Sequence, residues 1–104
     1  MSESIKLTTK LHKRCHEGIA YYIFWCPGCE CGHVYCVGTG SRTTWNFNGD
    51  INKPTFTPSL LNHREGWRCH LFLTDGVINY CGDCTHSLAG LTVGMIDIPE
   101  DYGT

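Results

Sequence analysis

Two close-set cysteine pairs are the feature that most constrains how this chain can fold. Residues 26–29 read C-P-G-C and residues 81–84 read C-G-D-C, and a histidine follows each pair, at His33 and His86. In a C-x-x-C turn two thiolates converge on one ion, and Pro, Gly and Asp are residues that favour such a turn. Two pairs of this kind predict a structural metal site.

The rest of the sequence favours zinc over disulfides as the partner of these thiols. The chain has 104 residues and eight cysteines, and we expect a single domain over residues 1–104 with a modest core. Its N-terminus has no apolar signal segment, and no apolar stretch is long enough to span a bilayer, so we expect a protein of the cytoplasm, where thiols stay reduced. A structural zinc site contributes on the order of 10 kcal/mol, against roughly 2–4 kcal/mol for one disulfide.

The charge of the chain disfavours nucleic acid as a partner. The formal net charge is -2, and one short basic run, residues 10–14, is the main cluster of positive side chains. Phosphate binding depends on clustered Lys and Arg, so we expect neither a nucleic-acid binder nor a membrane protein.

The pattern of side chains predicts a mainly β fold, a small zinc-stabilised antiparallel domain with little helix and zinc-ribbon-like knuckles. No window shows a clean helical stripe, whereas β-branched and aromatic residues are frequent and twelve glycines separate them. We expect a loose tail from about residue 97. The expected strands cover residues 5–12, 19–25, 33–37, 43–47, 59–62, 68–74 and 77–81.

A hairpin is predicted around Asp75-Gly76, between the strands at 68–74 and 77–81. A three-residue loop places Cys69 opposite Cys81. A two-residue loop places Cys69 opposite Gly82, on the same face as Cys84 if the strand continues. Either register brings Cys69 beside the second cysteine pair.

The metal ligands are therefore chosen from more thiols than one tetrahedral ion can use. Cys26 and Cys29 come first, because a C-P-G-C turn has few other uses in a reducing compartment, and Cys84 follows. The fourth position is open among Cys69, Cys81, His33 and His86, and the hairpin geometry favours Cys69. The remaining thiols, Cys15, Cys31 and Cys36, are expected to act as small hydrophobic side chains.

Two further groups have both a structural and a functional interpretation. His33, His70 and His86 could be hydrogen-bonded core residues, support the metal ligands, or form a catalytic cluster with Asp83. The segment 45–61 is rich in Asn, Asp and Pro and is expected to be a rigid loop, or else a recognition surface anchored by its aromatic residues.

Several motifs together resemble a family of small uncharacterised proteins of tailed phages and prophages, some of which carry the unsupported label ammonia monooxygenase. The motifs are F-W-C-P-G-C at 24–29, W-N-F-N-G-D at 45–50, P-T-F-T-P-S-L-L at 54–61, C-H at 69–70 and D-C-T-H-S-L-A-G at 83–90. The resemblance implies a phage origin and bound zinc but no reaction. By this resemblance the candidates for the metal and for a polar cluster around it are Cys26, Cys29, His33, Cys69, His70, Cys84 and His86. The resemblance is weakest at Cys81, where the family tends to have an apolar residue.

Two classes of function follow from these observations. The first is a non-enzymatic, zinc-stabilised binding module that acts on a host or phage protein in the host cytoplasm, with counter-defence as one role. The second is a zinc-dependent hydrolase or nuclease that uses His33, His70, His86 and Asp83. The absence of a basic groove and of a recognisable catalytic set in the sequence favours the binding module, and hence a protein without enzymatic activity.

Overall fold

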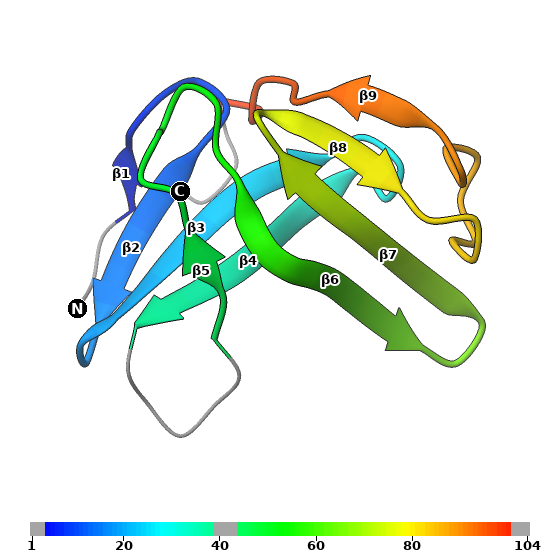
Figure 1. The fold of residues 1–104 in the computed structure, drawn as a ribbon, viewed down its shortest axis with the longest axis horizontal. Coiled ribbons are helices and arrows are strands. Elements are labelled where there is room, and N and C mark those ends of the chain that lie inside the picture. The colour runs from blue at the N-terminus through cyan, green and yellow to red at the C-terminus, as the bar shows by residue number, and fades with distance from the viewer. Residues whose placement is uncertain (1–3, 39–43, 101–104) are drawn as a thin grey trace.

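The computed structural model describes residues 4–38 and 44–100, which form two antiparallel sheets (Figure 1). The described residues include no helix that could cross a membrane. The first sheet has the order β1-β2-β3-β4 and the second has the order β5-β6-β7-β8-β9. The strands are β1 (Ile5–Lys6), β2 (His12–His16), β3 (Ile19–Cys26), β4 (Cys31–Gly38), β5 (Asn46–Phe47), β6 (Phe56–Arg64), β7 (Trp67–Thr74), β8 (Val77–Tyr80) and β9 (Thr92–Gly94). The expected mainly β fold is confirmed.

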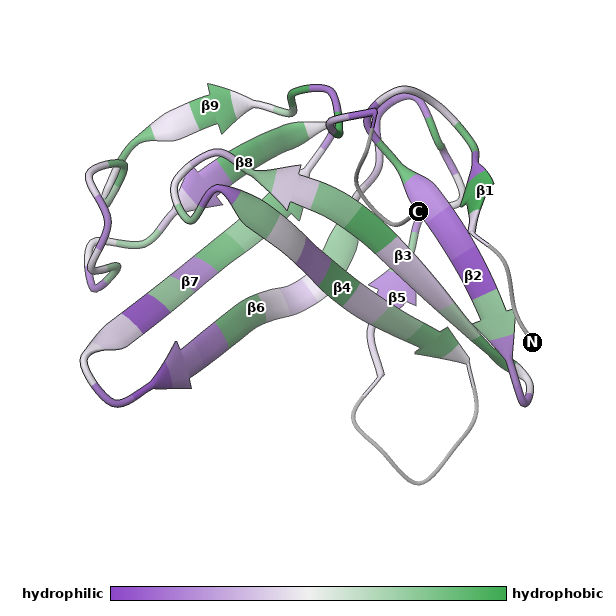
Figure 2. Cartoon of the chain, turned by 180° about the vertical axis from the view of Figure 1, so that it is seen from behind, coloured by the Kyte–Doolittle hydropathy of each residue, from purple (hydrophilic) through white to green (hydrophobic). Residues whose placement is uncertain are grey.

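The first cysteine turn is the connection of the β3–β4 hairpin. Cys26 pairs with Cys31 at the end of the ladder, and the Glu30 N–H donates to the Cys26 carbonyl at 2.7 Å. The strand β3 is rich in apolar residues whereas β2 is mostly hydrophilic, as Figure 2 shows. Because β3 lies inside the sheet and is flanked on both sides, it can bury these residues and deliver the cysteines to the core.

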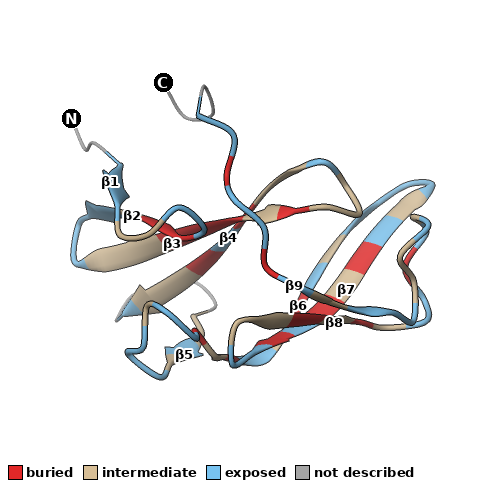
Figure 3. Ribbon diagram, turned by 90° about the horizontal axis from the view of Figure 1, so that it is seen from above, coloured by how far each residue is buried: buried red, intermediate tan, exposed pale blue. Residues whose placement is uncertain are grey.

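Strands β7 and β8 form the second hairpin with a two-residue turn. Thr74 pairs with Val77, and Asp75 and Gly76 both have positive φ, 50° and 74°. Such a turn matches the twist of the flanking strands, and the shorter of the two expected loops is therefore correct. The side chains of β7 alternate between buried and more exposed positions (Figure 3).

Aromatic side chains from both sheets fill the space between them. The Tyr35 ring of β4 stacks on the Phe56 ring of β6 at a centroid distance of 4.3 Å, and the Phe24 ring of β3 also stacks on Tyr35, at 5.6 Å. Leu71 and Ile78 of the second sheet are completely buried in the same cluster. The two sheets thus share one core, and Cys26 and Cys69 belong to it.

The expected strand over residues 5–12 is wrong, because the chain turns within it. The N–H groups of Leu7 and Thr8 both donate to the Leu11 carbonyl, at 3.0 and 3.1 Å. This turn buries Leu11 completely and lets His12 start a new strand, β2. The alternation around Thr9 came from a short strand and a turn rather than from one ladder.

Strand β6 is longer than the expected 59–62 and contains an irregularity. Phe56 pairs with Leu73 and Leu60 pairs with Leu71, so the register shifts between them, at the cis Thr57–Pro58 bond and Ser59. The expected strand at 43–47 is present as Asn46–Phe47, while Thr43 lies outside the described residues. Within the expected loose tail from about residue 97, Ile98 is buried and its N–H donates to the Thr9 carbonyl at 2.8 Å, so the start of this segment is attached to the fold.

Candidate functional site

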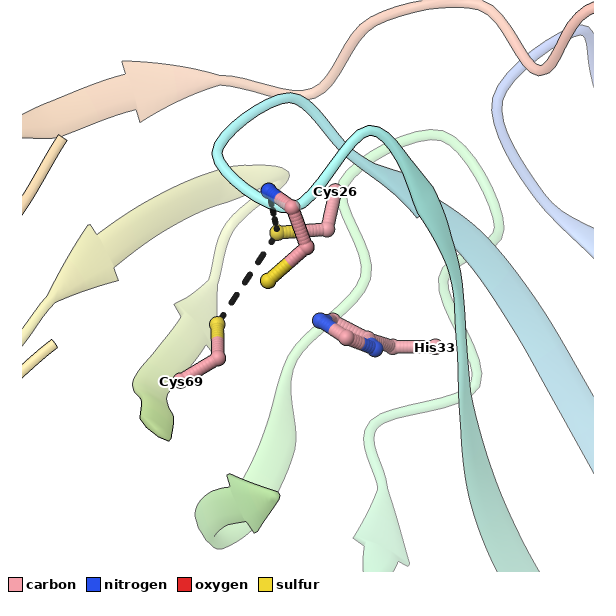
Figure 4. Close-up of side chains that lie close together, drawn as sticks. Cys26, His33 and Cys69 are labelled. Atoms are coloured by element: carbon pink, nitrogen blue, oxygen red, sulfur yellow. Dashed lines mark hydrogen bonds between the residues drawn. The ribbon is translucent and has the colours of Figure 1, made fainter. Parts of the chain in front are cut away.

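Four side chains from both sheets converge at the buried end of the core. One ligand atom each from Cys26, Cys29, His33 and Cys69 lies within 4.8 Å of the other three. The Sγ atoms of Cys26 and Cys69 are 3.9 Å apart, and Figure 4 shows His33 turned toward them. Because Cys69 comes from β7 and the other three come from the β3–β4 hairpin, an ion held here would join the two sheets. This group, the thiol cluster, could hold a metal ion.

The thiol cluster stabilises one negative charge but opposes a second. A hydrogen bond from the Cys69 thiol, with a further contribution from the Tyr80 hydroxyl, lowers the pKa of Cys26 to about 3. That same bond, together with burial, raises the pKa of Cys69, and burial together with the charge of Cys26 raises the pKa of Cys29 to about 12. A divalent cation would remove this conflict, since it lets all three sulfurs ionise together.

His33 has a nitrogen suited to binding such a cation. Its Nε2 atom is buried and has no hydrogen-bond partner, while its Nδ1 atom lies 3.3 Å from the Asn62 side-chain amide. When a half-turn of the Asn62 amide exchanges its nitrogen and oxygen, the oxygen accepts the Nδ1 proton and the Nε2 lone pair is free for the metal. An orphaned buried nitrogen next to three thiols fits a tetrahedral Cys₃His site.

His86 is placed to support the cluster as a hydrogen-bond donor. Its Nδ1 atom accepts from the Leu88 N–H at 3.2 Å, so in the neutral ring the proton resides on Nε2, which lies 3.4 Å from the Cys69 sulfur. A Cβ atom at Gly28 would overlap the His86 ring, which explains the glycine in the first cysteine turn. The Tyr80 hydroxyl adds a contact of 3.0 Å to the Cys26 sulfur.

Cys84 belongs to a second, overlapping group with Cys69 and His86. Its sulfur accepts from the His70 N–H at 3.3 Å and lies 3.2 Å from the His70 carbonyl oxygen. The structure therefore brings three of the four expected ligands, Cys26, Cys29 and Cys69, into the thiol cluster. It places Cys84 against the backbone of β7.

A different constellation lies on the outer face of the second sheet. The Ser59 Oγ atom is 3.1 Å from His70 Nε2, and His70 Nδ1 is 3.3 Å from Asp83 Oδ2. The serine hydroxyl, the imidazole and the carboxylate thus form one hydrogen-bonded chain, which we call the triad. The His70 and Asp83 side chains retain 27% and 41% of their exposure, so the site is open to a substrate.

The irregular part of β6 places Ser59 within reach of His70. Leu61 pairs directly with His70, so Ser59, two residues earlier on the same face, is its diagonal neighbour. The Trp45 indole N–H donates to the Ser59 carbonyl at 3.1 Å and fixes the backbone there.

The loop after β8 brings Asp83 to the other side of the ring. The Thr85 N–H donates to the Arg68 carbonyl at 2.9 Å, and the Arg68 N–H donates to the Thr85 hydroxyl at 3.0 Å. These bonds attach the loop to β7 beside His70. Arg68 also places a guanidinium nitrogen 3.4 Å from Asp83 Oδ2.

The surroundings keep Asp83 ionised. Desolvation acts to raise its pKa, but the hydrogen bond to His70, a backbone N–H and the charges of His70 and Arg68 outweigh desolvation, so the pKa lies below its usual value. An ionised carboxylate accepts the Nδ1 proton of a histidine, which leaves the Nε2 lone pair directed at the serine. The arrangement is chemically competent for general-base activation of Ser59.

The sequence singled out His70 and Asp83 but missed Ser59. It grouped His33, His70 and His86 with Asp83. In the described residues His33 belongs to the thiol cluster and His86 contacts it, so that of these three histidines only His70 contacts Asp83. No nucleophile motif surrounds Ser59, and its pairing with His70 depends on the register of β6 against β7. The signal that could have found Ser59 is its position directly after Pro58 in the motif P-T-F-T-P-S-L-L at 54–61.

One protein-family model matches most of the chain. The model of the BubE family, described as a bacterial ubiquitination-like system serine protease, matches residues 2–81. The chain belongs to this family. The matched range contains Ser59 and His70 and ends just before Asp83. No curated protein and no solved structure matches the chain. The family description names neither a phage nor a metal, so the expected phage origin stays a prediction.

Proposed function

We propose that the chain is a serine peptidase in which Ser59 is the nucleophile, His70 the general base and Asp83 the group that orients His70. The observation that carries the proposal is the pair of contacts on the two nitrogens of His70, 3.1 Å to Ser59 and 3.3 Å to Asp83. The family description, which names a serine protease, supports the same reaction class.

In the proposed reaction His70 Nε2 takes the hydroxyl proton as Ser59 Oγ attacks the carbonyl carbon of the scissile peptide bond. The imidazolium then protonates the leaving amine, and an acyl group remains on Ser59. Water attacks this ester after giving a proton to His70, which regenerates the free serine. Asp83 keeps its negative charge throughout and stabilises the imidazolium, a role that fits the lowered pKa of its carboxyl group.

We propose that the substrate is a protein of a bacterial ubiquitination-like system. The support is the family description together with the open position of the triad on a sheet face, where an extended segment of another protein can reach Ser59. The reducing cytoplasm is the compartment that this assignment requires, because the thiol cluster needs reduced cysteines.

We also propose that the thiol cluster holds zinc in a closed structural role. Cys26, Cys29, Cys69 and His33 would be its ligands, and the orphaned Nε2 atom of His33 favours this histidine over Cys84 as the fourth. Four protein ligands leave no position for a reactive water, so the ion would supply stability by joining the sheets and would take no part in the reaction. The sequence-based choice of Cys84 stays a prediction.

The binding module that the sequence favoured also stays a prediction. It would use the same zinc-stabilised fold to hold a host or phage protein without cleaving it. The zinc-dependent hydrolase is less well supported, because His33 and His86 contact the thiol cluster while His70 and Asp83 contact Ser59.

The test is cleavage of each protein component of a bacterial ubiquitination-like system, followed by mass spectrometry of the products. We expect one new terminus to form with the parent protein and none with Ser59→Ala, while both proteins melt at the same temperature. Equal cleavage by Ser59→Ala would contradict the proposal. Stable binding without cleavage by the parent would favour the binding module.

A further inference from the structure

We propose that His70, Cys81 and Asp83 form a second metal site, which takes a soft divalent cation such as Zn²⁺ or Cd²⁺ and switches off the triad when occupied. One ligand atom from each of the three residues lies within 4.8 Å of the other two. The existence of the site follows from this geometry alone, whereas the switching role rests on the proposed peptidase function.

The register of β7 against β8 explains why the three side chains meet. Leu71 pairs with Tyr80, and the ladder continues by one step because the Cys81 N–H donates to the His70 carbonyl at 2.9 Å. Residues directly opposite each other share one face of a sheet, so Cys81 and His70 lie together on the outer face. Asp83 completes the group from the following turn, with Oδ2 at 3.3 Å from His70 Nδ1.

The donor set and the accessibility of this group differ from those of the thiol cluster. An imidazole, a thiolate and a carboxylate are ligands that suit zinc or cadmium, whereas magnesium prefers oxygen ligands alone. Cys81 and His70 are half-buried and Asp83 is exposed, so an ion can enter and leave from solvent. Three protein ligands also leave one coordination position of a tetrahedral ion for water.

An ion at this position would remove the general base. The ring nitrogen that faces Asp83 is Nδ1, and the other nitrogen, Nε2, faces Ser59. If the ion takes Nδ1 and the Asp83 carboxylate, the neutral ring keeps its single proton on Nε2, and Cys81 releases its thiol proton to solvent. A protonated Nε2 cannot accept the Ser59 proton, so the peptidase stops while the fold is unchanged.

The positive charge of the Arg68 guanidinium would repel a cation bound at this second site. Its guanidinium lies 3.4 Å from Asp83 Oδ2, the oxygen that also faces His70, and both side chains of this ion pair are partly exposed. The guanidinium must move aside when a cation binds. Arg68→Gln should therefore tighten the binding of the second ion, whereas Cys81→Ala should remove it.

The experiment measures zinc binding and cleavage separately. Equilibrium dialysis against micromolar zinc is carried out with the Ser59→Ala protein and with the Ser59→Ala, Cys81→Ala double variant, both purified with their zinc. Cleavage by the parent, by Cys81→Ala and by Cys15→Ala is then measured over a zinc series. Cys81→Ala keeps every backbone bond of that position, and Cys15 is an exposed thiol of β2 that serves as the matched control.

We expect the Ser59→Ala protein to bind one more zinc ion per chain than the double variant. The zinc concentration that halves cleavage should rise at least about tenfold in Cys81→Ala and stay unchanged in Cys15→Ala. Equal zinc content in the two dialysed proteins would overturn the site. An extra, Cys81-dependent ion that leaves cleavage unchanged would overturn the switching role. Cys81-dependent binding with no cleavage by any variant would uphold the site and overturn the peptidase.

Discussion

Neighbouring residues of β7 carry opposite chemistry on the two faces of the sheet. Cys69 is completely buried, and its sulfur belongs to the thiol cluster. His70, the next residue, points outward between Ser59 and Asp83. Because successive side chains of a strand alternate between faces, one short segment serves both a metal centre inside and a candidate active site outside.

This difference separates residues that look equivalent in the sequence. Cysteines and histidines cluster along the chain, and their number suggests one extended metal site. In the structure the inner group has burial, mutual hydrogen bonds and an orphaned nitrogen, whereas the outer group has exposure, a hydroxyl and an ionised carboxylate. Burial favours a closed structural site and exposure favours chemistry on a substrate.

The largest effects are expected from Cys69→Ser and His70→Ala, which test the two faces at adjacent positions. Cys69→Ser removes a proposed zinc ligand, and a structural zinc contributes on the order of 10 kcal/mol, as much as the whole stability of a typical domain. We expect unfolded, zinc-free protein by circular dichroism and metal analysis. His70→Ala should fold and keep its zinc but lose about 10⁶-fold in kcat.

The melting temperature of the His70→Ala protein checks that its loss of activity does not come from unfolding. The variant loses two hydrogen bonds at a partly exposed side chain, about 1 kcal/mol each, and its melting temperature should fall by no more than about 16 °C. A zinc-loaded, stable Cys69→Ser protein would show that the thiol cluster has no structural role. An unfolded His70→Ala protein would show that the two faces are not separable.

A smaller effect is expected from Asp83→Asn, which removes the charge of the triad and keeps its shape. The amide presents no carboxylate to the His70 Nδ1 proton, so the ring loses its fixed tautomer and its imidazolium loses a stabilising charge. We expect kcat to fall by about 10⁴-fold with an unchanged melting temperature. Peptide cleavage kinetics measure the change, and Asp75→Asn, at the exposed tip of the β7–β8 hairpin, is the matched control. A loss of similar size in Asp75→Asn would remove the special role of Asp83.

The smallest effect is expected from Thr85→Val, which loosens the loop that positions Asp83. The valine keeps the shape of the side chain but loses the hydroxyl that bonds to the Arg68 N–H and carbonyl. The lost bonds are worth about 1 kcal/mol each, and we expect kcat to fall several-fold with little change in KM. Thr92→Val, which loses a hydroxyl bond to Asn79 farther along the sheet, should leave kcat unchanged. A wild-type kcat in Thr85→Val would show that this attachment does not position Asp83.

The inner site was easier to predict from the sequence than the outer one. Cys26 and Cys29 are close in sequence, so local turn geometry brings them together. The hairpin around Gly76 placed Cys69 beside the second cysteine pair, and the family resemblance supported Cys69 as a ligand, whereas its contact with Cys26 joins the two sheets. The position of His33 depends on the β3–β4 register, which Cys26 and Cys31 complete. Local patterns therefore predicted the mainly β fold and three of the four members of the thiol cluster.

The triad could not be predicted in the same way, because it joins three non-local positions. Ser59 meets His70 through the register of β6 against β7, and Asp83 meets it because Thr85 attaches the following loop to β7. Neither feature has a distinct sequence pattern. A serine without a nucleophile motif looks like any other polar residue at the edge of a Pro-rich segment.

The most direct measurement is covalent labelling of the zinc-loaded protein with a fluorophosphonate, followed by peptide mass spectrometry. The account predicts one modified residue, Ser59, with labelling lost in His70→Ala and strongly slowed in Asp83→Asn, while the zinc content of all three proteins stays the same. Such labelling needs an activated serine and no knowledge of the substrate. A parent protein that is folded, zinc-loaded and unlabelled at Ser59, or labelled equally in His70→Ala, would contradict the account.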